Sequence, residues 1–159
     1  MAGAPAAAHP VLLDQFDEGM LAEHIGFRVH IARRAIQRTM RDVPDKRPDA
    51  LPSGSISILE LVARNPGIAP HDLADILFLD PPKVTVLIRH LKNAGLISRT
   101  ASRSDGRKAE LRVTAEGSAR LATTRSFSAQ QEEKIAQGLS ASERAQLIRL
   151  LRKLQETLR

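Results

Sequence analysis

The chain has 159 residues, with 24 Lys or Arg against 18 Asp or Glu, and its net charge of +6 favours an anionic partner. The absence of cysteine excludes disulfides, thiolate metal sites and thiol-based redox sensing. Only 3% of the residues are aromatic, and aromatic rings are what usually grip single-stranded nucleic acid, so duplex DNA is the favoured anionic partner.

The N-terminal part predicts a tail followed by a long helix. Residues 1–16 begin with a stretch rich in Ala and Pro and are expected to form a flexible tail. From Asp17 to about position 42, apolar residues recur every three or four positions, which is typical of an amphipathic helix. Three prolines in residues 42–52 then predict a loop.

Three shorter helices are expected next. The first covers residues 53–64, with its initial serine as the N-cap, and it ends at an Asn-Pro-Gly turn. The second covers residues 70–77 and the third residues 81–93, and both begin with proline, which suits the first turn of a helix. Asp80 is a good N-cap for the third helix, and Gly95 suits the left-handed position after its end.

A hairpin and two longer helices complete the predicted fold. Residues 96–100 and 110–114 alternate like strands around an Asp105-Gly106 tip. Thr114 can N-cap a long helix that runs to about Gln137 and is ended by Gly138. Ser140-Ala-Ser-Glu143 is a capping-box pattern that opens a final helix with a stripe of leucines. The expected fold is therefore mainly α with a small β-hairpin.

Basic charge is concentrated in the segment that holds the third short helix and the hairpin. Residues 1–80 contain eight Lys or Arg and eleven Asp or Glu, whereas residues 81–112 contain eight and two. Two short helices followed by a hairpin with a basic tip are the plan of a winged helix-turn-helix. In that plan one helix enters the major groove of DNA and the wing reaches the neighbouring minor groove. We therefore predict a winged helix-turn-helix over residues 53–114.

Two segments resemble the MarR family of bacterial transcription regulators. Residues 105–117, Asp-Gly-Arg-Lys-Ala-Glu-Leu-Arg-Val-Thr-Ala-Glu-Gly, are similar to that family's wing and exit, D-x-R-x-x-x-L-x-L-T-x-x-G. Residues 59–97, with an Asn-Pro-Gly turn and a Leu-Lys-Asn-Ala-Gly-Leu-Ile end, also fit the family. The resemblance implies a single domain over residues 17–159. It implies a homodimer whose dimerisation helices, at about 17–42 and 115–158, intertwine and place two winged segments on one palindromic site.

The predicted DNA-contacting residues lie in three places. On the outward face of the third short helix, Arg89 can bind guanine, and Thr85 or Val86 can touch a thymine methyl. A basic hairpin tip can enter a narrow minor groove, and the resemblance points to Arg107 in particular. Free N–H groups at the start of the first short helix can bind phosphate, or the serines there simply cap the helix. The full predicted set is Ser53, Ser55, Pro82, Lys83, Thr85, Val86, Arg89, His90, Arg103, Arg107 and Lys108.

The first predicted helix carries candidate effector-binding residues. An aromatic side chain there can hold an aromatic ligand, and an arginine or histidine can hold an anion. The alternative is that its arginines are surface residues or ion-pair partners in a dimer. The predicted effector set is Phe27, Arg28, His30, Ile31 and Arg34. The resemblance implies a site between the dimerisation helices and the winged segment, with an aromatic carboxylate or its acyl-CoA thioester as the expected effector.

Catalysis and metal binding are not expected. The chain has no G-x-S-x-G, P-loop, G-x-G-x-x-G or H-E-x-x-H pattern. His24 and His30 fall on different faces of a helix and are poor metal partners, and no cofactor is expected. No run is long and apolar enough to span a membrane, and the first residues lack a signal-peptide pattern, so we expect a cytoplasmic protein.

Three functions stay open from the sequence. The favoured one is a ligand-responsive regulator acting as a repressor, whose dimer leaves duplex DNA when a small molecule changes the spacing of its winged segments. The alternative is an architectural or constitutive DNA-binding factor with no effector. The third is a winged-helix protein-interaction module, and the basic wing argues against it. A ligand pocket would separate the first two, and the sequence does not show one.

Overall fold

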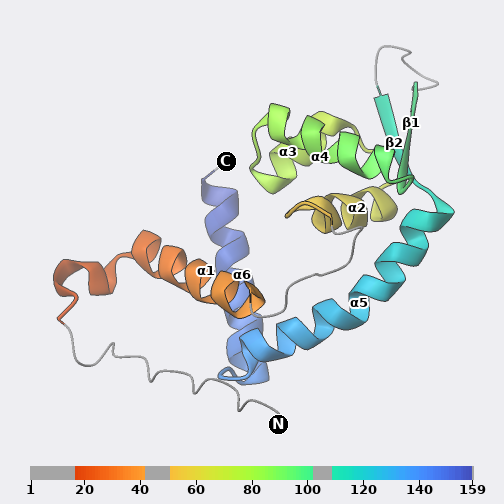
Figure 1. Ribbon diagram of the computed structural model, residues 1–159. Helices are drawn as coiled ribbons and strands as arrows, with labels where there is room; N and C mark the ends of the chain where they lie inside the picture. Colours follow the sequence, from red (N-terminus) through yellow and green to blue (C-terminus); the bar gives the residue numbers. More distant parts are fainter. Residues whose placement is uncertain (1–16, 42–50, 102–108, 159) are drawn as a thin grey trace, which may run out of the picture. The chain divides into compact units, whose positions relative to one another are not determined.

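The structure is a computed structural model, and it describes residues 17–41, 51–101 and 109–158. The chain divides into two units, one up to Pro44 and one from Asp45 onward (Figure 1). The second unit holds the winged segment and the two C-terminal helices. Each unit is described by itself.

The first unit contains a short 3-10 helix, η2 (Gly19–Glu23), and the helix α1 (Ile25–Arg41). The prediction of one continuous helix from Asp17 is wrong at its start. Gly19 has a φ of 54°, and its N–H donates to the Asp17 carboxylate at 2.8 Å. His24 is extended and separates the two helices. Local turn chemistry therefore replaces the first turns of the expected helix.

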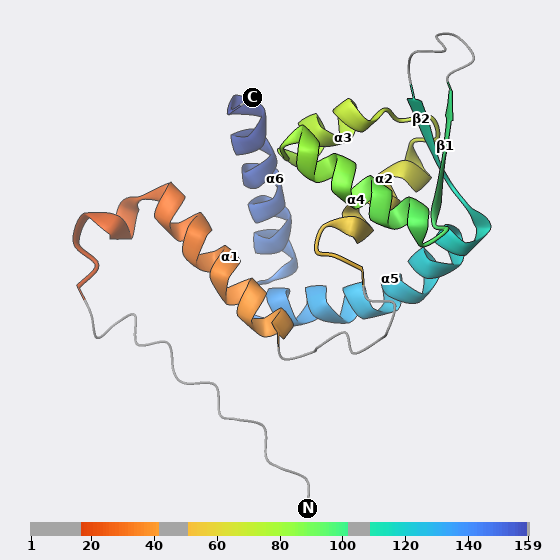
Figure 2. The ribbon, with the colours of Figure 1, turned by 45° about the horizontal axis from the view of Figure 1, so that its top comes forward.

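The second unit contains five helices and a hairpin among its described residues (Figure 2). Its winged segment consists of α2 (Ser55–Arg64), α3 (Pro70–Leu77), α4 (Pro81–Asn93), β1 (Ile97–Ala101) and β2 (Ala109–Val113). The two strands are antiparallel, with Ile97 opposite Val113. The helices α5 (Ala115–Ala136) and α6 (Ala141–Thr157) follow. The predicted fold, mainly α with a small β-hairpin, is confirmed.

Most helix boundaries follow from local side-chain chemistry. Pro70 and Pro81 stand at the first positions of α3 and α4, and Gly95 adopts a φ of 72° just after α4. Ser140 and Glu143 form the expected reciprocal capping box at the start of α6. These predictions are confirmed. Each of these residues suits a helix end, where backbone N–H and C=O groups have no partner within the helix.

The predicted start of α2 is wrong by two residues. Gly54, not Ser53, is the N-cap, and its φ of 92° lies in the left-handed region that favours glycine. The helix then begins at Ser55, whose N–H donates to the Pro52 carbonyl at 3.0 Å. The chain therefore enters α2 through a tight turn rather than through a serine cap.

The hydrophobic core lies within the winged segment and the start of α5. α2, α3 and α4 each turn an apolar face inward, the hairpin contributes residues from both strands and from the turn before it, and α5 adds one leucine. The buried residues are Ile58, Leu59, Val62, Leu73, Ala74, Val84, Leu87, Ile88, Leu91, Leu96, Ile97, Leu111 and Leu121. Because the inner face of α4 is fixed by this core, its opposite face is presented to solvent in one orientation.

A set of short bonds fastens the end of α4 to the start of α5. The Thr114 hydroxyl donates to the Gly95 carbonyl at 2.7 Å and accepts from the Gly117 N–H at 3.0 Å. The Thr114 N–H donates to the Leu96 carbonyl at 3.1 Å. Thr114 is therefore the predicted N-cap of α5 and also ties that helix to the strand entry.

The helix α6 leaves an apolar stripe in solvent within this single chain. Leu147 and Leu150 each expose 46% of their surface, and Leu151 exposes 39%. The Arg144 guanidinium, also on α6, reaches the Glu132 carboxylate of α5 at 3.4 Å. Across the described segments, no helix has the length and hydropathy needed to cross a lipid bilayer.

Candidate nucleic-acid interface and a pocket beside it

The outward face of α4 is a continuous exposed surface. Val84, Leu87, Ile88 and Leu91 point into the core, so the positions between them face solvent. The exposed positions are Pro82, Lys83, Thr85, Val86, Arg89 and His90. Of the predicted DNA-contacting residues, these six are therefore brought together on one helix face.

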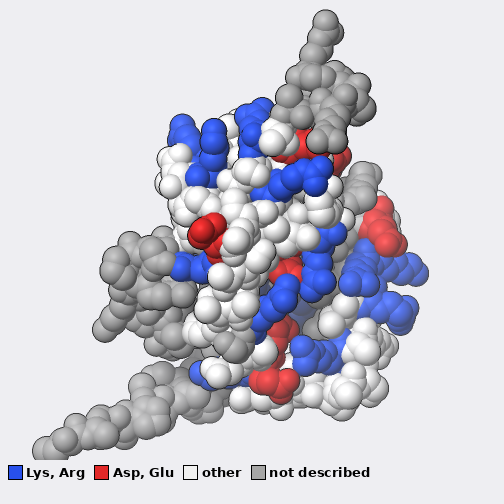
Figure 3. Space-filling view, turned by 90° about the vertical axis from the view of Figure 1, so that its right-hand side faces the viewer, with Lys and Arg blue, Asp and Glu red and all other residues white. Residues whose placement is uncertain are grey.

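Basic side chains extend from this helix onto the hairpin. The described residues from α4 to β2 carry five exposed cations, Lys83, Arg89, Lys92, Arg99 and Arg112. Arg112 also pairs with Glu110 on the same strand at 3.3 Å. Figure 3 views the molecule from the side on which the hairpin lies in Figure 1, and it shows Lys and Arg side chains spread along this face. The exposed Lys and Arg side chains on α4 and on the hairpin can bind the phosphates of a DNA duplex.

The rest of the predicted DNA-contacting set divides in two. Arg103, Arg107 and Lys108, with the Asp105-Gly106 tip, lie outside the described residues. Ser53 is exposed beside the start of α2, but Ser55 has no exposed surface. The prediction that Ser55 contacts DNA is therefore wrong, because α2 starts at Ser55 and its first turn packs against the core.

The predicted effector residues all lie in the first unit. Arg28 is engaged there, since its guanidinium pairs with Glu18 and its Nε donates to the Ala22 carbonyl at 2.9 Å. Phe27 is half-buried, and the other three predicted residues, His30, Ile31 and Arg34, are exposed. Their role in effector binding stays a prediction. No metal-binding cluster of His, Asp and Glu occurs in the part of the chain that the structure describes.

A pocket lies between the winged segment and α5, in the region that the resemblance implies for an effector, but none of the predicted effector residues lines it. Its walls come from three helices: α2 contributes Ile56, Ser57, Glu60 and Leu61, α3 contributes Ile76 and Leu77, and α5 contributes Leu121, Thr124, Arg125 and Ser128. Five of these ten residues are Leu or Ile, and two are charged. We call this site the α2–α5 pocket. It can hold an apolar body with one anionic or polar end.

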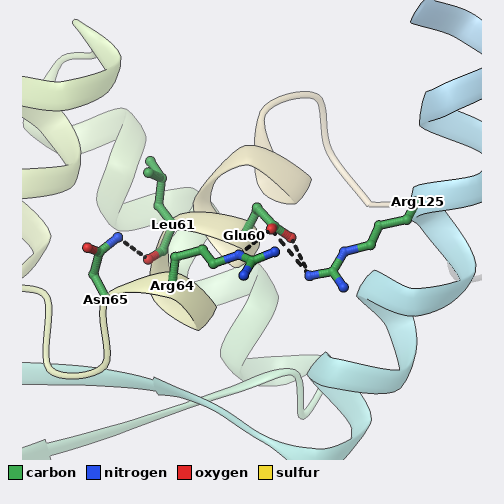
Figure 4. A network of polar contacts seen from close by, with 5 residues as sticks. All are labelled: Glu60, Leu61, Arg64, Asn65 and Arg125. Atoms are coloured by element: carbon green, nitrogen blue, oxygen red, sulfur yellow. Dashed lines mark hydrogen bonds and ion pairs between the residues drawn. The ribbon is translucent and has the colours of Figure 1, made fainter.

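The two charged residues of the α2–α5 pocket form part of an ion-pair network (Figure 4). The Arg64 Nε donates to Glu60 Oε1 at 3.0 Å within α2. The Arg125 Nη2 lies 3.3 Å and 3.4 Å from the two Glu60 oxygens and so joins α5 to α2. The hydrogen bond from Arg64 and the added contacts from Arg125 hold the pKa of Glu60 below the usual value for a glutamate, although partial burial opposes the shift.

One part of this network has a signal in the sequence. Glu60 and Arg64 are four residues apart, a spacing that places two side chains on the same face of a helix. Arg125 is 65 residues from Glu60, and nothing local indicates that the two meet. The apolar pocket walls likewise come from three separate helices, so only the folded chain shows the site.

Comparison with known proteins agrees with this architecture. The sequence model of the MarR family matches residues 51–108. A relative from Thauera aromatica, described as a putative transcriptional regulatory protein for the hcr operon, is 29% identical over 146 residues, which cover 89% of this chain and 85% of the relative.

Solved structures give the same fold. The transcriptional repressor CouR, bound to a 23-mer DNA duplex, is 27% identical with a TM-score of 0.75, covering 87% of this chain and 97% of that one. BpsR from Bordetella bronchiseptica is 22% identical with a TM-score of 0.74 and the same coverage. The DNA binding of BpsR is regulated by 6-hydroxynicotinic acid.

The sequence motifs, the winged arrangement and the relatives lead to one conclusion. The hairpin wing follows a helix pair whose second helix, α4, has an exposed face carrying Lys83 and Arg89, which is an architecture for binding duplex DNA. The curated relatives are transcription regulators, not enzymes. Over residues 51–108 this chain is similar to the MarR family of winged-helix transcription regulators, and its fold is that of solved members of that family.

Proposed function

We propose that this regulator is a repressor that binds palindromic duplex DNA as a homodimer and is released by a small anionic aromatic effector. The observation that carries the proposal is the α2–α5 pocket, which lies between the winged segment and the long helix α5 and combines apolar walls with Arg125. A ligand there touches both elements at once. It can therefore favour one arrangement of them over another by unequal affinity.

The exposed stripe on α6 supports the homodimer. Burying one leucine side chain contributes roughly 1.5–3 kcal/mol, and α6 presents Leu147, Leu150 and Leu151 with a large part of each side chain uncovered. A partner helix that covers this stripe would make the dimer stable. Light scattering at micromolar concentration is expected to give twice the 17.4 kDa chain mass, and the mass of a single chain would contradict the dimer.

The exposed face of α4 supports binding in the major groove. Two copies that place α4 in successive major grooves on one side of the duplex require half-sites about 34–36 Å apart. Lys83 and Arg89 are the described cations best placed for this contact. The basic wing residues Arg103, Arg107 and Lys108 remain proposed minor-groove contacts, as the sequence predicts.

The pocket supports an effector with an apolar ring and an anionic end. CouR and BpsR share the fold, and the regulator of BpsR, 6-hydroxynicotinic acid, is an aromatic acid. The five Leu and Ile side chains of the pocket suit a ring, and Arg125 suits an anion. An aromatic carboxylate and its acyl-CoA thioester are the two ligand classes proposed here.

The deciding experiment measures operator binding against a panel of candidate effectors. An operator is first selected from random duplex DNA with the purified full-length protein. Fluorescence anisotropy then follows that operator at fixed salt while aromatic acids, their amides and their acyl-CoA thioesters are added. Release by an acid or a thioester supports the proposal. If none of the compounds binds the protein or releases the DNA, the chain acts as a constitutive DNA-binding factor instead.

A further inference from the structure

We infer that Arg125 binds the carboxylate of the effector, and that Glu60 is the protein's own carboxylate which the effector displaces. The inference rests on the proposed function, because it places the effector in the α2–α5 pocket. It goes further by naming the anchoring residue, the free acid as the ligand class, and the contact that the ligand breaks.

The ion pair between Arg125 and Glu60 is weak enough for a ligand carboxylate to replace Glu60. Its two distances are 3.3 and 3.4 Å, and one nitrogen of Arg125 faces both carboxylate oxygens. The two side chains are 57% and 37% exposed. Ion pairs with this much solvent contact are weak, so a carboxylate with better geometry can replace Glu60.

The exchange leaves no carboxylate without a partner. Glu60 keeps its shorter bond to Arg64, 3.0 Å from Nε to Oε1, after Arg125 turns away. A ligand carboxylate and Glu60 carry the same charge, so they do not share Arg125 without mutual repulsion. Binding therefore replaces the Glu60 carboxylate at Arg125 with the carboxylate of the ligand.

The remaining pocket walls select the body of the ligand. Leu61, Ile76 and Leu77 lie on the winged segment, and Leu121 lies on α5 one turn before Arg125. A ring packed between these side chains has its carboxylate directed along α5 toward Arg125. The neutral acyl group of a thioester offers no such charge at that position, so the free acid is the preferred form.

The exchanged contact is also a connection between two elements. Glu60 belongs to α2 of the winged segment, and Arg125 belongs to α5, which follows the wing. Replacing Glu60 with a ligand removes this ion pair from between the two helices. The effector then changes how α2 is held against α5, which is a coupling of ligand binding to the DNA-binding segment.

The test compares matched acids and amides on three variants of the full-length chain. The probes are benzoate, salicylate, 4-hydroxybenzoate, cinnamate and the corresponding amides, measured by calorimetry and by operator release. The variants are Glu60→Gln, Arg125→Gln and the control Arg144→Gln. Arg144 makes a comparable cross-helix pair with Glu132 at 3.4 Å, and it does not line the α2–α5 pocket.

The expected results separate the acid from the amide. Wild-type protein binds at least one acid about tenfold or more tighter than its amide, the size of a charge-assisted hydrogen bond. Glu60→Gln raises the affinity for that acid, because Arg125 no longer has to be released. Arg125→Gln makes acid and amide bind alike, and Arg144→Gln leaves both affinities unchanged.

Three kinds of failure are distinguishable. If acid and amide bind the wild type equally, or if Glu60→Gln leaves the affinity for the acid unchanged or lower, the exchange at Arg125 is overturned, although release of DNA by these compounds still supports the proposed function. If only thioesters bind and release DNA, the free-acid assignment is overturned and the effector site stands. If no probe or thioester binds, both proposals are overturned.

Discussion

Gly117, in the first turn of α5, packs directly against the carbonyl oxygen of Leu96: a Cβ built on Gly117 would stand 2.1 Å from that oxygen. It would also stand 2.7 Å from the Val113 side chain. The first of these obstacles is backbone, which cannot give way without moving the hairpin. We expect Gly117→Ala to lower the free energy of unfolding by about 1–3 kcal/mol, measured by urea denaturation.

Gly26 provides the matched control for this substitution. It also lies in a helix, α1, but a Cβ there meets nothing within 4 Å. Gly26→Ala is expected to be neutral or to stabilise the protein by up to about 1 kcal/mol, because alanine favours the helix. Equal effects of the two substitutions would show that the contact with Leu96 does not restrict position 117.

Thr114 is expected to be sensitive to loss of its hydroxyl. Thr114→Val removes the bond to the Gly95 carbonyl and the cap on the Gly117 N–H. The expected cost is about 1–2 kcal/mol of unfolding free energy. Thr114→Ser keeps the hydroxyl and should retain most of the stability. If serine and valine are equally destabilising in thermal unfolding, the methyl group rather than the hydroxyl carries the role of Thr114.

Arg89 is expected to contribute to sequence-specific DNA binding. It is exposed on the outer face of α4, where a guanidinium can make two parallel bonds to guanine. Arg89→Ala should weaken operator binding by about 1–3 kcal/mol. Arg89→Lys keeps the charge but cannot make two parallel bonds, so it should recover only part of the affinity that the alanine variant loses. Full recovery with lysine, measured at fixed salt, would mean that Arg89 contacts phosphate alone.

Operator affinity is expected to fall steeply with salt. Residues 81–112 contain eight Lys or Arg, and a dimer doubles that number, although only some can reach phosphate. With roughly 6–10 phosphate contacts per dimer, the plot of log K against log salt should have a slope of about −5 to −9. Anisotropy titrations between low and moderate salt give this slope. A slope near zero would contradict binding through the basic face.

The Glu60 network predicts a loss of stability in acid. The pKa of Glu60 is lower in the folded protein than for an ordinary glutamate, mainly because of its hydrogen bond from Arg64. Its contribution to stability is therefore present above about pH 4.3, the ordinary pKa of the side chain, and is lost as the pH falls through the lower pKa of the folded protein. Unfolding of wild type and Glu60→Gln should differ at pH 6, and the difference should shrink as the pH falls through the lowered pKa of Glu60. A constant difference at every pH would show that Glu60 acts through packing alone.

The features predictable from the sequence are those set by neighbouring residues. Pro70 and Pro81 mark helix starts because a backbone N–H in the first turn has no partner within the helix, so proline loses nothing there by lacking one. Thr114 and Ser140 mark later starts because their hydroxyls accept from orphan backbone donors. The inner face of α4 follows from the spacing of its apolar residues. The exposed positions between them, which we propose to contact DNA, follow in turn.

The features not predictable are those that depend on distant residues or on turn geometry. The left-handed Gly54 replaces Ser53 as the N-cap of α2, and nothing in the sequence separates these two choices. Such a turn also buries Ser55, which looked accessible. The meeting of Glu60 and Arg125 requires α2 and α5 to pack together, and the pocket walls also need α3. The residues that line the pocket were therefore missed, although an effector site between the winged segment and the dimerisation helices was expected.

The close contact of Gly117 with Leu96 makes α5 a lever whose pivot lies beside the end of α4, the helix that we propose to contact DNA. α5 has 22 residues, which gives a length of about 33 Å. Because Thr114 and Gly117 fix its first turn to Gly95 and Leu96, a displacement of about 3 Å at the far end corresponds to a rotation of about 5° at the joint. Gly95 and Leu96 directly follow α4, so this rotation is passed to α4 without a slack loop between them. The glycine at position 117 thus allows α5 to pack closely against Leu96, and this close packing makes the connection between α5 and α4 stiff.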